Sequence, residues 1–134
     1  MRYQDWPERL HKIMAESHIK PFMWGSHDCC LFAANIVFEL TGVDPASALR
    51  GEYETALEAA RIVKERGGVR QIATDSLGGE ISPLAAKRGD IVMIETKEHG
   101  DTLAVCIGFV CVAPGLDRLQ YLPMSEAVTA WEVR

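Results

Sequence analysis

Residues 24–32 read WGSHDCCLF and contain the feature that best predicts the fold, a cysteine where a loop turns into a helix. Asp28 suits the N-cap of that helix, because its carboxylate accepts hydrogen bonds from the first free backbone N–H groups. The same N–H groups and the partial positive charge of a helix start stabilise a thiolate, so the pKa of a cysteine there falls. The stretch therefore predicts a helix that begins near Asp28 and presents Cys29 as a candidate nucleophile.

Helical periodicity dominates the first half of the chain. The pattern predicts a first helix from Trp6 that ends before Pro21, with Asp5 as its N-cap, and then the Cys29 helix as far as Thr41. The two further helices expected are a short one beginning at Asp44-Pro45 and one from Tyr53 to Gly67.

Short β-branched runs separated by turn residues dominate the last third. The strands expected are Ile91–Thr96, Thr102–Gly108, Phe109–Ala113, Leu119–Leu122 and Val128–Val133. Helices followed by hairpins indicate an α+β domain, in which the Cys29 helix packs on an antiparallel sheet.

Composition narrows the class of protein. A chain of 134 residues with 48% hydrophobic residues is expected to form a single domain, residues 1–134. The net charge of −5 and the lack of a Lys/Arg cluster argue against nucleic acid as a partner. No segment approaches the roughly 20 apolar residues that span a bilayer, and no apolar signal core follows Met1. We therefore expect synthesis in the cytoplasm, no export by a cleaved signal and no membrane insertion.

The four cysteines have no metal-site spacing. Cys29 and Cys30 are adjacent, and the interval from Cys106 to Cys111 matches neither a zinc knuckle nor a ferredoxin run. Reduced thiols without metal or cofactor are the expectation, with Cys106 and Cys111 as small buried residues of strands. A cysteine-ligated metal or iron–sulfur cluster is the alternative.

Four ordered motifs resemble the NlpC-type cell-wall peptidases of the papain-like superfamily. They are WG at 24–25, DC at 28–29 before an apolar helix, RGDIV at 88–92 and VCIG at 105–108. A closer resemblance is to small tail-tip proteins of tailed phages and prophages that carry a WGxHDC motif. It is seen in WGSHDCC at 24–30, TGVDP at 41–45 and RGEY at 50–53. This resemblance implies a papain-like fold, a location in the virion tail tip, and other tail-tip or baseplate proteins as partners, with peptidoglycan as a further candidate.

The resemblance also implies roles for individual residues. Cys29 matches the nucleophile and Asp28 the residue before it, while the histidine that opens the strand ending Ile-Gly is replaced by Thr102. Threonine does not take a proton from a thiol near neutral pH. His99, three residues before Thr102, and His27, two before Cys29, are the remaining candidate bases.

Three functions follow from these residues. The preferred hypothesis is a structural or assembly protein of a phage tail tip with an incomplete catalytic set. The first alternative is an active cysteine endopeptidase that cleaves peptidoglycan stem peptides during DNA entry, with Cys29 as nucleophile and His99 or His27 as base. The second alternative is a cysteine-ligated metal or iron–sulfur protein of the tail tip.

Overall fold

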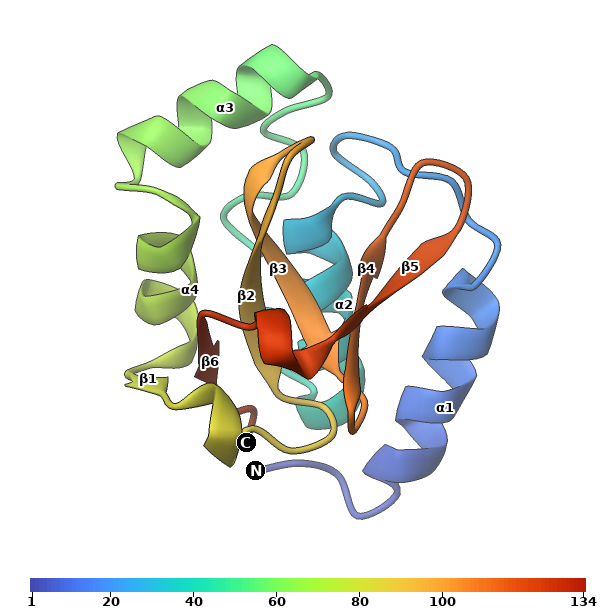
Figure 1. Cartoon of the computed structure of the whole chain (residues 1–134). Helices are drawn as coiled ribbons and strands as arrows, with labels where there is room; N and C mark the ends of the chain where they lie inside the picture. Colours follow the sequence, from blue (N-terminus) through green and yellow to red (C-terminus); the bar gives the residue numbers. More distant parts are fainter.

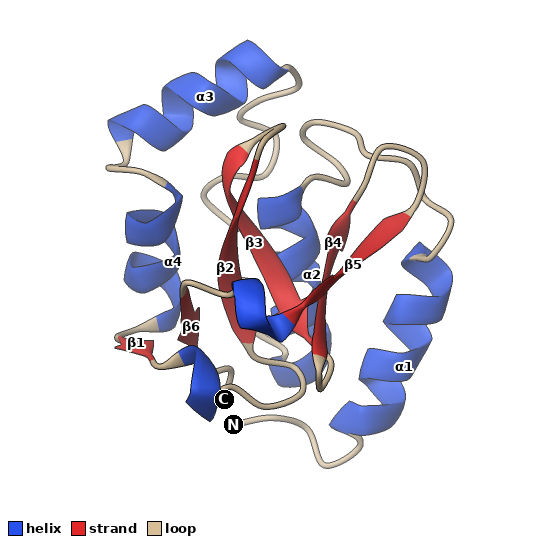
Figure 2. Ribbon diagram, in the orientation of Figure 1, coloured by secondary structure: helices blue, strands red, loops and turns tan.

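Four helices and a six-stranded antiparallel sheet make up the computed structural model, which describes residues 1–134 (Figure 1). The helices are α1 (Trp6–Ser17), α2 (Cys29–Thr41), α3 (Ala56–Glu65) and α4 (Val69–Leu77). The strands are β1 (Glu80–Ile81), β2 (Ile91–Thr96), β3 (Gly100–Cys106), β4 (Val110–Pro114), β5 (Leu119–Pro123) and β6 (Thr129–Trp131). Two short 3₁₀ helices, η1 (Pro83–Ala85) and η2 (Met124–Glu126), complete the chain. Helices therefore precede all the strands, which confirms the predicted α+β class (Figure 2).

The helix that carries Cys29 forms as predicted, because both of its ends are capped. Asp28 Oδ1 accepts a hydrogen bond of 2.9 Å from the backbone N–H of Leu31 at the start. At the end Gly42 adopts a φ of 79°, a left-handed conformation that glycine reaches without strain, and its N–H donates to the Phe38 carbonyl. Most of the helix is apolar and buried, so α2 is the central helix of the core.

The central strands of the sheet are buried on both faces. Its strands run in the order β1-β6-β2-β3-β4-β5, all antiparallel to their neighbours. Leu103 and Val105 of β3 belong to the core that includes α2, whereas Ala104 and Cys106 belong to a separate core on the other face. Figure 1 shows α2 behind the sheet and η2 in front of it. From Leu103 to Cys106, both alternating sets of residues along β3 are therefore apolar.

Three local predictions from the sequence are wrong. No helix starts at Asp44-Pro45, where residues 45–51 form turns and the Asp44 carboxylate binds the Arg50 side chain at 2.7 Å. The Asp5 carboxylate does not cap α1, because it accepts a hydrogen bond of 2.8 Å from Arg9 instead. The sequence pattern predicts no helix between Gly67 and the strand at Ile91, yet α4 lies there and follows the turn at Gly67 and Gly68.

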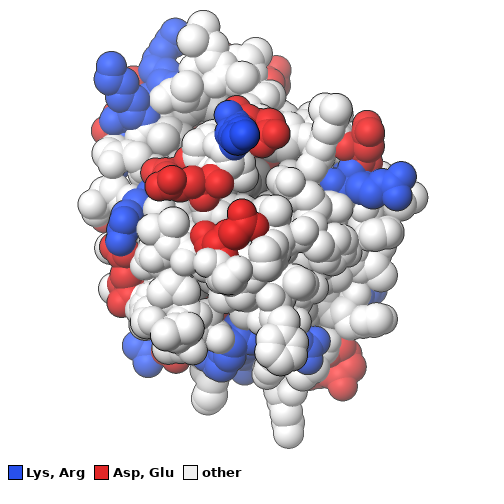
Figure 3. Space-filling view, in the orientation of Figure 1, with Lys and Arg blue, Asp and Glu red and all other residues white.

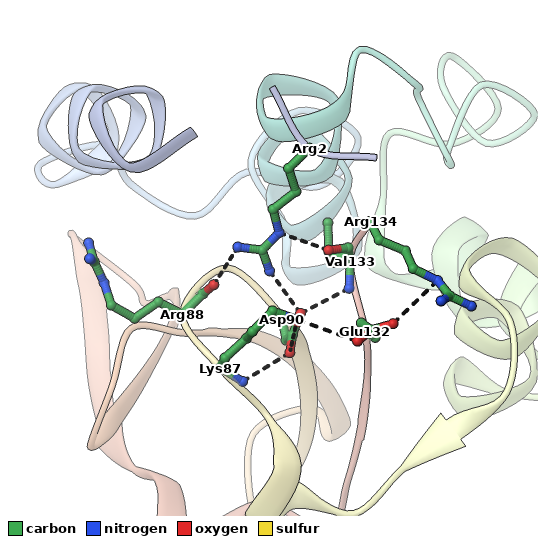
Figure 4. Close-up of polar contacts among 7 residues, drawn as sticks. All are labelled: Arg2, Lys87, Arg88, Asp90, Glu132, Val133 and Arg134. Atoms are coloured by element: carbon green, nitrogen blue, oxygen red, sulfur yellow. Dashed lines mark hydrogen bonds and ion pairs between the residues drawn. The ribbon is translucent and has the colours of Figure 1, made fainter. Parts of the chain in front are cut away.

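The two ends of the chain are joined through a buried carboxylate (Figure 4). Asp90 Oδ1 accepts hydrogen bonds of 2.9 Å from Arg2 Nη2 and from the backbone N–H of Val133. Arg2 also donates to the carbonyls of Val133 and Arg88, and Asp90 Oδ2 accepts from the backbone N–H of Lys87. This network fixes the turn at residues 88–90 immediately before β2.

The surface carries mixed charge. On the face shown in Figure 3, acidic and basic side chains are interspersed, with white surface between them. None of the four helices has the length and apolar character needed to cross a membrane.

Candidate functional site

Cys29 is the first residue of α2 and its side chain is half-buried. Its thiol pKa lies below the ordinary value, because the Cys30 thiol and the backbone of Leu103 stabilise the thiolate by hydrogen bonding. Burial and the negative charge of Asp28 act in the opposite direction but do not reverse the shift. The pKa of Cys30 is raised well above its usual value by the same interaction and by burial. Of these two neighbouring thiols, Cys29 is therefore the one that becomes the thiolate.

Asp28 organises the loop in front of this cysteine. Besides capping α2, its carboxylate accepts hydrogen bonds at Oδ2 from the backbone N–H of Gly25 at 3.0 Å and from Tyr53 Oη at 2.7 Å. Gly25 has a φ of 80°, and a side chain there would collide with the Tyr53 carbonyl. Asp28 is only 1% exposed, and its three hydrogen bonds position the loop and the helix start.

A cavity of about 300 Å³ lies beside Cys29. Its walls come from the segment before α2, the loop at residues 49–53, helices α3 and α4, and the tip of the β2–β3 hairpin. Most of the lining side chains are apolar, and the polar members are Asp28, Lys64, His99 and Asp101. The volume falls in the range of about 300–1,000 Å³ that is typical of small-molecule sites.

His99 lines the same cavity as Cys29. It lies between β2 and β3, where its ring stacks on Phe22 with centroids 5.1 Å apart and meets the edge of Trp24 at 5.5 Å. No hydrogen bond joins His99 to Cys29, and the backbone N–H of His99 donates to Thr96 Oγ1. The structure therefore brings this candidate base to the thiol's cavity and holds it against two aromatic rings.

Thr102 does not face the thiol. Its side chain is buried on the sheet face opposite α2, where Thr102 Oγ1 contacts Thr96 Oγ1 at 3.2 Å and the Gly100 carbonyl at 3.1 Å. The neighbouring residues Asp101 and Leu103 have the opposite orientation, and Asp101 lines the Cys29 cavity. The alternation of side chains along β3 therefore directs Asp101, and not Thr102, to the cysteine's side of the sheet.

His27 lies away from Cys29. It lines a separate groove of about 430 Å³ between α1 and α2, and its ring packs edge-on against Phe32. Its Nε2 is buried without a hydrogen-bond partner, and burial together with the nearby charge of Lys20 lowers its pKa. The structure does not bring His27 to the thiol as a base.

The four cysteines do not form one ligand set. Cys29 and Cys30 begin α2, whereas Cys106 and Cys111 pair across β3 and β4 on the sheet face that α2 does not cover. No group of three or more His, Cys, Asp or Glu side chains converges on a point suited to a metal ion. The four cysteines therefore lie at two separate places in the fold.

Two residues of the site lie in elements other than those that the sequence pattern predicts. Tyr53 was read as part of a helix, although it lies in the loop before α3 and binds Asp28. Asp101 lies just before the strand predicted to begin at Thr102, although in the structure it belongs to β3. The sequence does not predict which face of the sheet Asp101 lies on, because a strand that is buried on both faces has apolar residues at successive positions.

Comparison with known proteins agrees with this fold. Residues 1–133 match the profile of the family described as "Domain of unknown function (DUF6950)". A search among curated proteins finds no match. Among solved structures, the chain is similar to one described as "Crystal structure of NlpC/p60 domain of peptidoglycan hydrolase SagA". The sequence identity is 16%, the TM-score is 0.58, and the alignment covers 93% of this chain and 97% of that chain. The chain therefore has the NlpC/p60 type of papain-like fold that its motifs predict.

Proposed function

This chain belongs to the DUF6950 family, and on that premise we propose that it is a structural or assembly component of a phage or prophage tail tip. The WGSHDCC motif at residues 24–30 supports the placement in a tail tip through its resemblance to small tail-tip proteins. In this role the partners are other tail-tip or baseplate proteins. The chain is made in the host cytoplasm and is carried in the virion.

The observation that carries the structural role is the composition of the strand opposite Cys29. Asp101 and Leu103 are the β3 residues directed to the α2 side, so no histidine of this strand faces the thiol. A carboxylate near a thiolate repels it and does not replace an imidazole as general base near neutral pH. A fold with such a site suits a role that depends on contacts with partner proteins.

Deletion of the gene from the phage or prophage that carries it tests this role. We expect tails to be absent or incomplete in electron micrographs, and we expect wild type and Cys29→Ala to restore them equally. Mass spectrometry of purified particles is expected to detect the chain. Normal tails in the deletion mutant, together with particles that lack the chain, would overturn the proposal.

A second candidate function is a cysteine peptidase that cleaves peptidoglycan stem peptides, with Cys29 as nucleophile and His99 as base. It is favoured by one observation, that both residues line the same cavity. His99 stacks on Phe22 and makes no hydrogen bond to the thiol, so the peptidase requires His99 to move before it can act as base.

Assays on purified peptidoglycan fragments separate the two candidates. The peptidase predicts stem-peptide cleavage that both Cys29→Ala and His99→Ala abolish, while His27→Ala retains it. Cleavage that is unchanged in Cys29→Ala rules out the peptidase, as does the absence of any cleavage by the wild-type protein.

A further inference from the structure

The inner wall of the Cys29 cavity is apolar. Helix α3 contributes Ala59 and Val63, and α4 contributes Val69 and Ile72, all buried or half-buried, while Ala56 and Ala60 of α3 line the cavity from exposed positions. The small alanine side chains leave the space that the cavity occupies. A wall of this kind favours an apolar group, because burying apolar surface stabilises the complex whereas burying an unpaired polar group destabilises it.

The polar groups inside the cavity already have partners. Tyr53 Oη donates to Asp28 Oδ2, which also accepts from the Gly25 N–H, and Asp28 Oδ1 accepts from Leu31. A peptide segment inserted here would leave its own N–H and C=O groups unpaired, at a cost for each group. An aliphatic chain has no such groups and fits the wall without this penalty.

The mouth of the cavity carries polar side chains, whereas its interior is apolar. Lys64, His99 and Asp101 are exposed polar residues of the lining, and Cys29 is half-buried. A ligand with a polar group at one end and an aliphatic chain at the other matches this division. The volume of about 300 Å³ corresponds to roughly ten methylene-sized groups if each takes about 30 Å³, the share of one water molecule in the liquid.

We propose that this cavity receives the aliphatic chain of an activated carboxylic ester or thioester, and that Cys29 accepts the acyl group. The thiolate sulfur attacks the carbonyl carbon, a carbon–sulfur bond forms, and the bond from that carbon to the leaving alcohol or thiol breaks. The leaving group departs with the negative charge that the thiolate brought, so the step needs no oxidant or reductant. This inference rests on the reactive Cys29 of the second candidate function but not on its peptide substrate.

Two esters with the same leaving group test the proposal, p-nitrophenyl octanoate and p-nitrophenyl acetate. The full-length protein is incubated with each, acylation of Cys29 is followed by mass spectrometry, and each rate is divided by the rate with free cysteine at the same pH. We expect the normalised octanoyl rate to exceed the acetyl rate by at least about tenfold, because octanoyl has about six methylenes more than acetyl and burial of only two of them gives this ratio. Iodoacetamide labels Cys29 in a parallel reaction.

Substitutions on α3 locate the effect in the cavity. Ala60→Leu fills part of the space and is expected to remove most of the octanoyl preference over acetyl. Leu57→Phe is the matched control, because Leu57 is 71% exposed and does not line the cavity. Equal normalised rates for the two esters in wild type, or a preference that Ala60→Leu leaves unchanged, overturn the proposal.

The iodoacetamide reaction distinguishes a failure of the aliphatic-ligand proposal from a failure of the reactive-thiol proposal. Labelling of Cys29 without any octanoyl preference rejects the aliphatic ligand and leaves the thiol site intact. A Cys29 that neither iodoacetamide nor the esters modify rejects the acyl acceptor together with the peptidase.

Discussion

Tyr53 Oη donates a hydrogen bond of 2.7 Å to Asp28 Oδ2, and this bond joins the loop before α3 to the first turn of the helix that carries Cys29. Burial and the Asp28 carboxylate raise the pKa of Tyr53 well above its usual value, so the hydroxyl stays protonated and keeps donating. One carboxylate thus positions the helix start, the Gly25 turn and one wall of the cavity.

Removal of this hydroxyl is expected to destabilise the protein. In Tyr53→Phe the Asp28 carboxylate loses a charge-assisted hydrogen bond in a buried site, so the free energy of unfolding is expected to fall by about 1.5–3 kcal/mol. Urea unfolding followed by circular dichroism measures the change. Tyr121→Phe serves as the control, because Tyr121 is exposed, and it is expected to change stability by no more than about 0.5 kcal/mol. Similar losses in the two variants would contradict the role of the Tyr53 bond.

Substitution of the neighbouring cysteine is expected to make Cys29 a weaker nucleophile. The Cys30 thiol makes the largest contribution to lowering the pKa of Cys29, so Cys30→Ala moves the alkylation midpoint to higher pH. The rate of iodoacetamide labelling at Cys29, measured by mass spectrometry from pH 6 to pH 10, gives this midpoint. Cys106→Ala, on the opposite face of the sheet, is expected to leave it unchanged. A midpoint that stays the same or falls in Cys30→Ala would refute this assignment.

Acid is expected to destabilise the fold through His27. Its pKa in the folded protein is lowered by burial and by Lys20, so the unfolded chain binds more protons below the ordinary value of 6.5. The free energy of unfolding therefore falls as the pH drops from 6.5 toward the folded-state pKa. His27→Leu removes the contribution of His27 protonation to the pH dependence of stability. The variant is therefore expected to lose less free energy of unfolding than wild type between pH 7.5 and pH 5, measured by urea unfolding.

The matched control for this experiment is His11→Leu, because His11 is an exposed residue of α1. It is expected to keep the wild-type pH profile. A His27→Leu profile parallel to that of wild type would show that His27 does not cause the loss in acid.

Loss of the Asp90 carboxylate is expected to be the most damaging of these changes. Asp90→Ala leaves the Arg2 guanidinium, whose side chain is 8% exposed, and the Val133 N–H without their partner. Breaking a buried ion pair on one side costs about 3–5 kcal/mol, so the variant is expected to unfold at much lower urea concentration. Arg134→Ala is the control, because its contact with Glu132 is exposed and contributes at most about 1 kcal/mol. Comparable stability of Asp90→Ala and Arg134→Ala would show that the network does not hold the termini.

Local signals in the sequence were sufficient for the strongest elements. The helix start at Asp28, the left-handed end at Gly42 and five of the six strands follow from capping residues and β-branched runs. The turn at 45–51 was misread, because Asp44 followed by Pro45 is typical of a helix start and the competing bond to Arg50 is not visible in the sequence. The two-residue strand β1 is too short to give a periodic pattern.

The sequence by itself determined that Cys29 begins a helix and that this helix packs on an antiparallel sheet, because both depend on neighbouring residues and on hydrophobic periodicity. Only the tertiary structure decided which residues share the thiol's cavity. Thr102 and Asp101 are adjacent in sequence, yet they lie on opposite faces of β3, and His99 reaches the cavity while His27 does not. Packing between distant segments determines which face of a doubly buried strand each side chain occupies. It also determines which side of a helix a loop residue reaches.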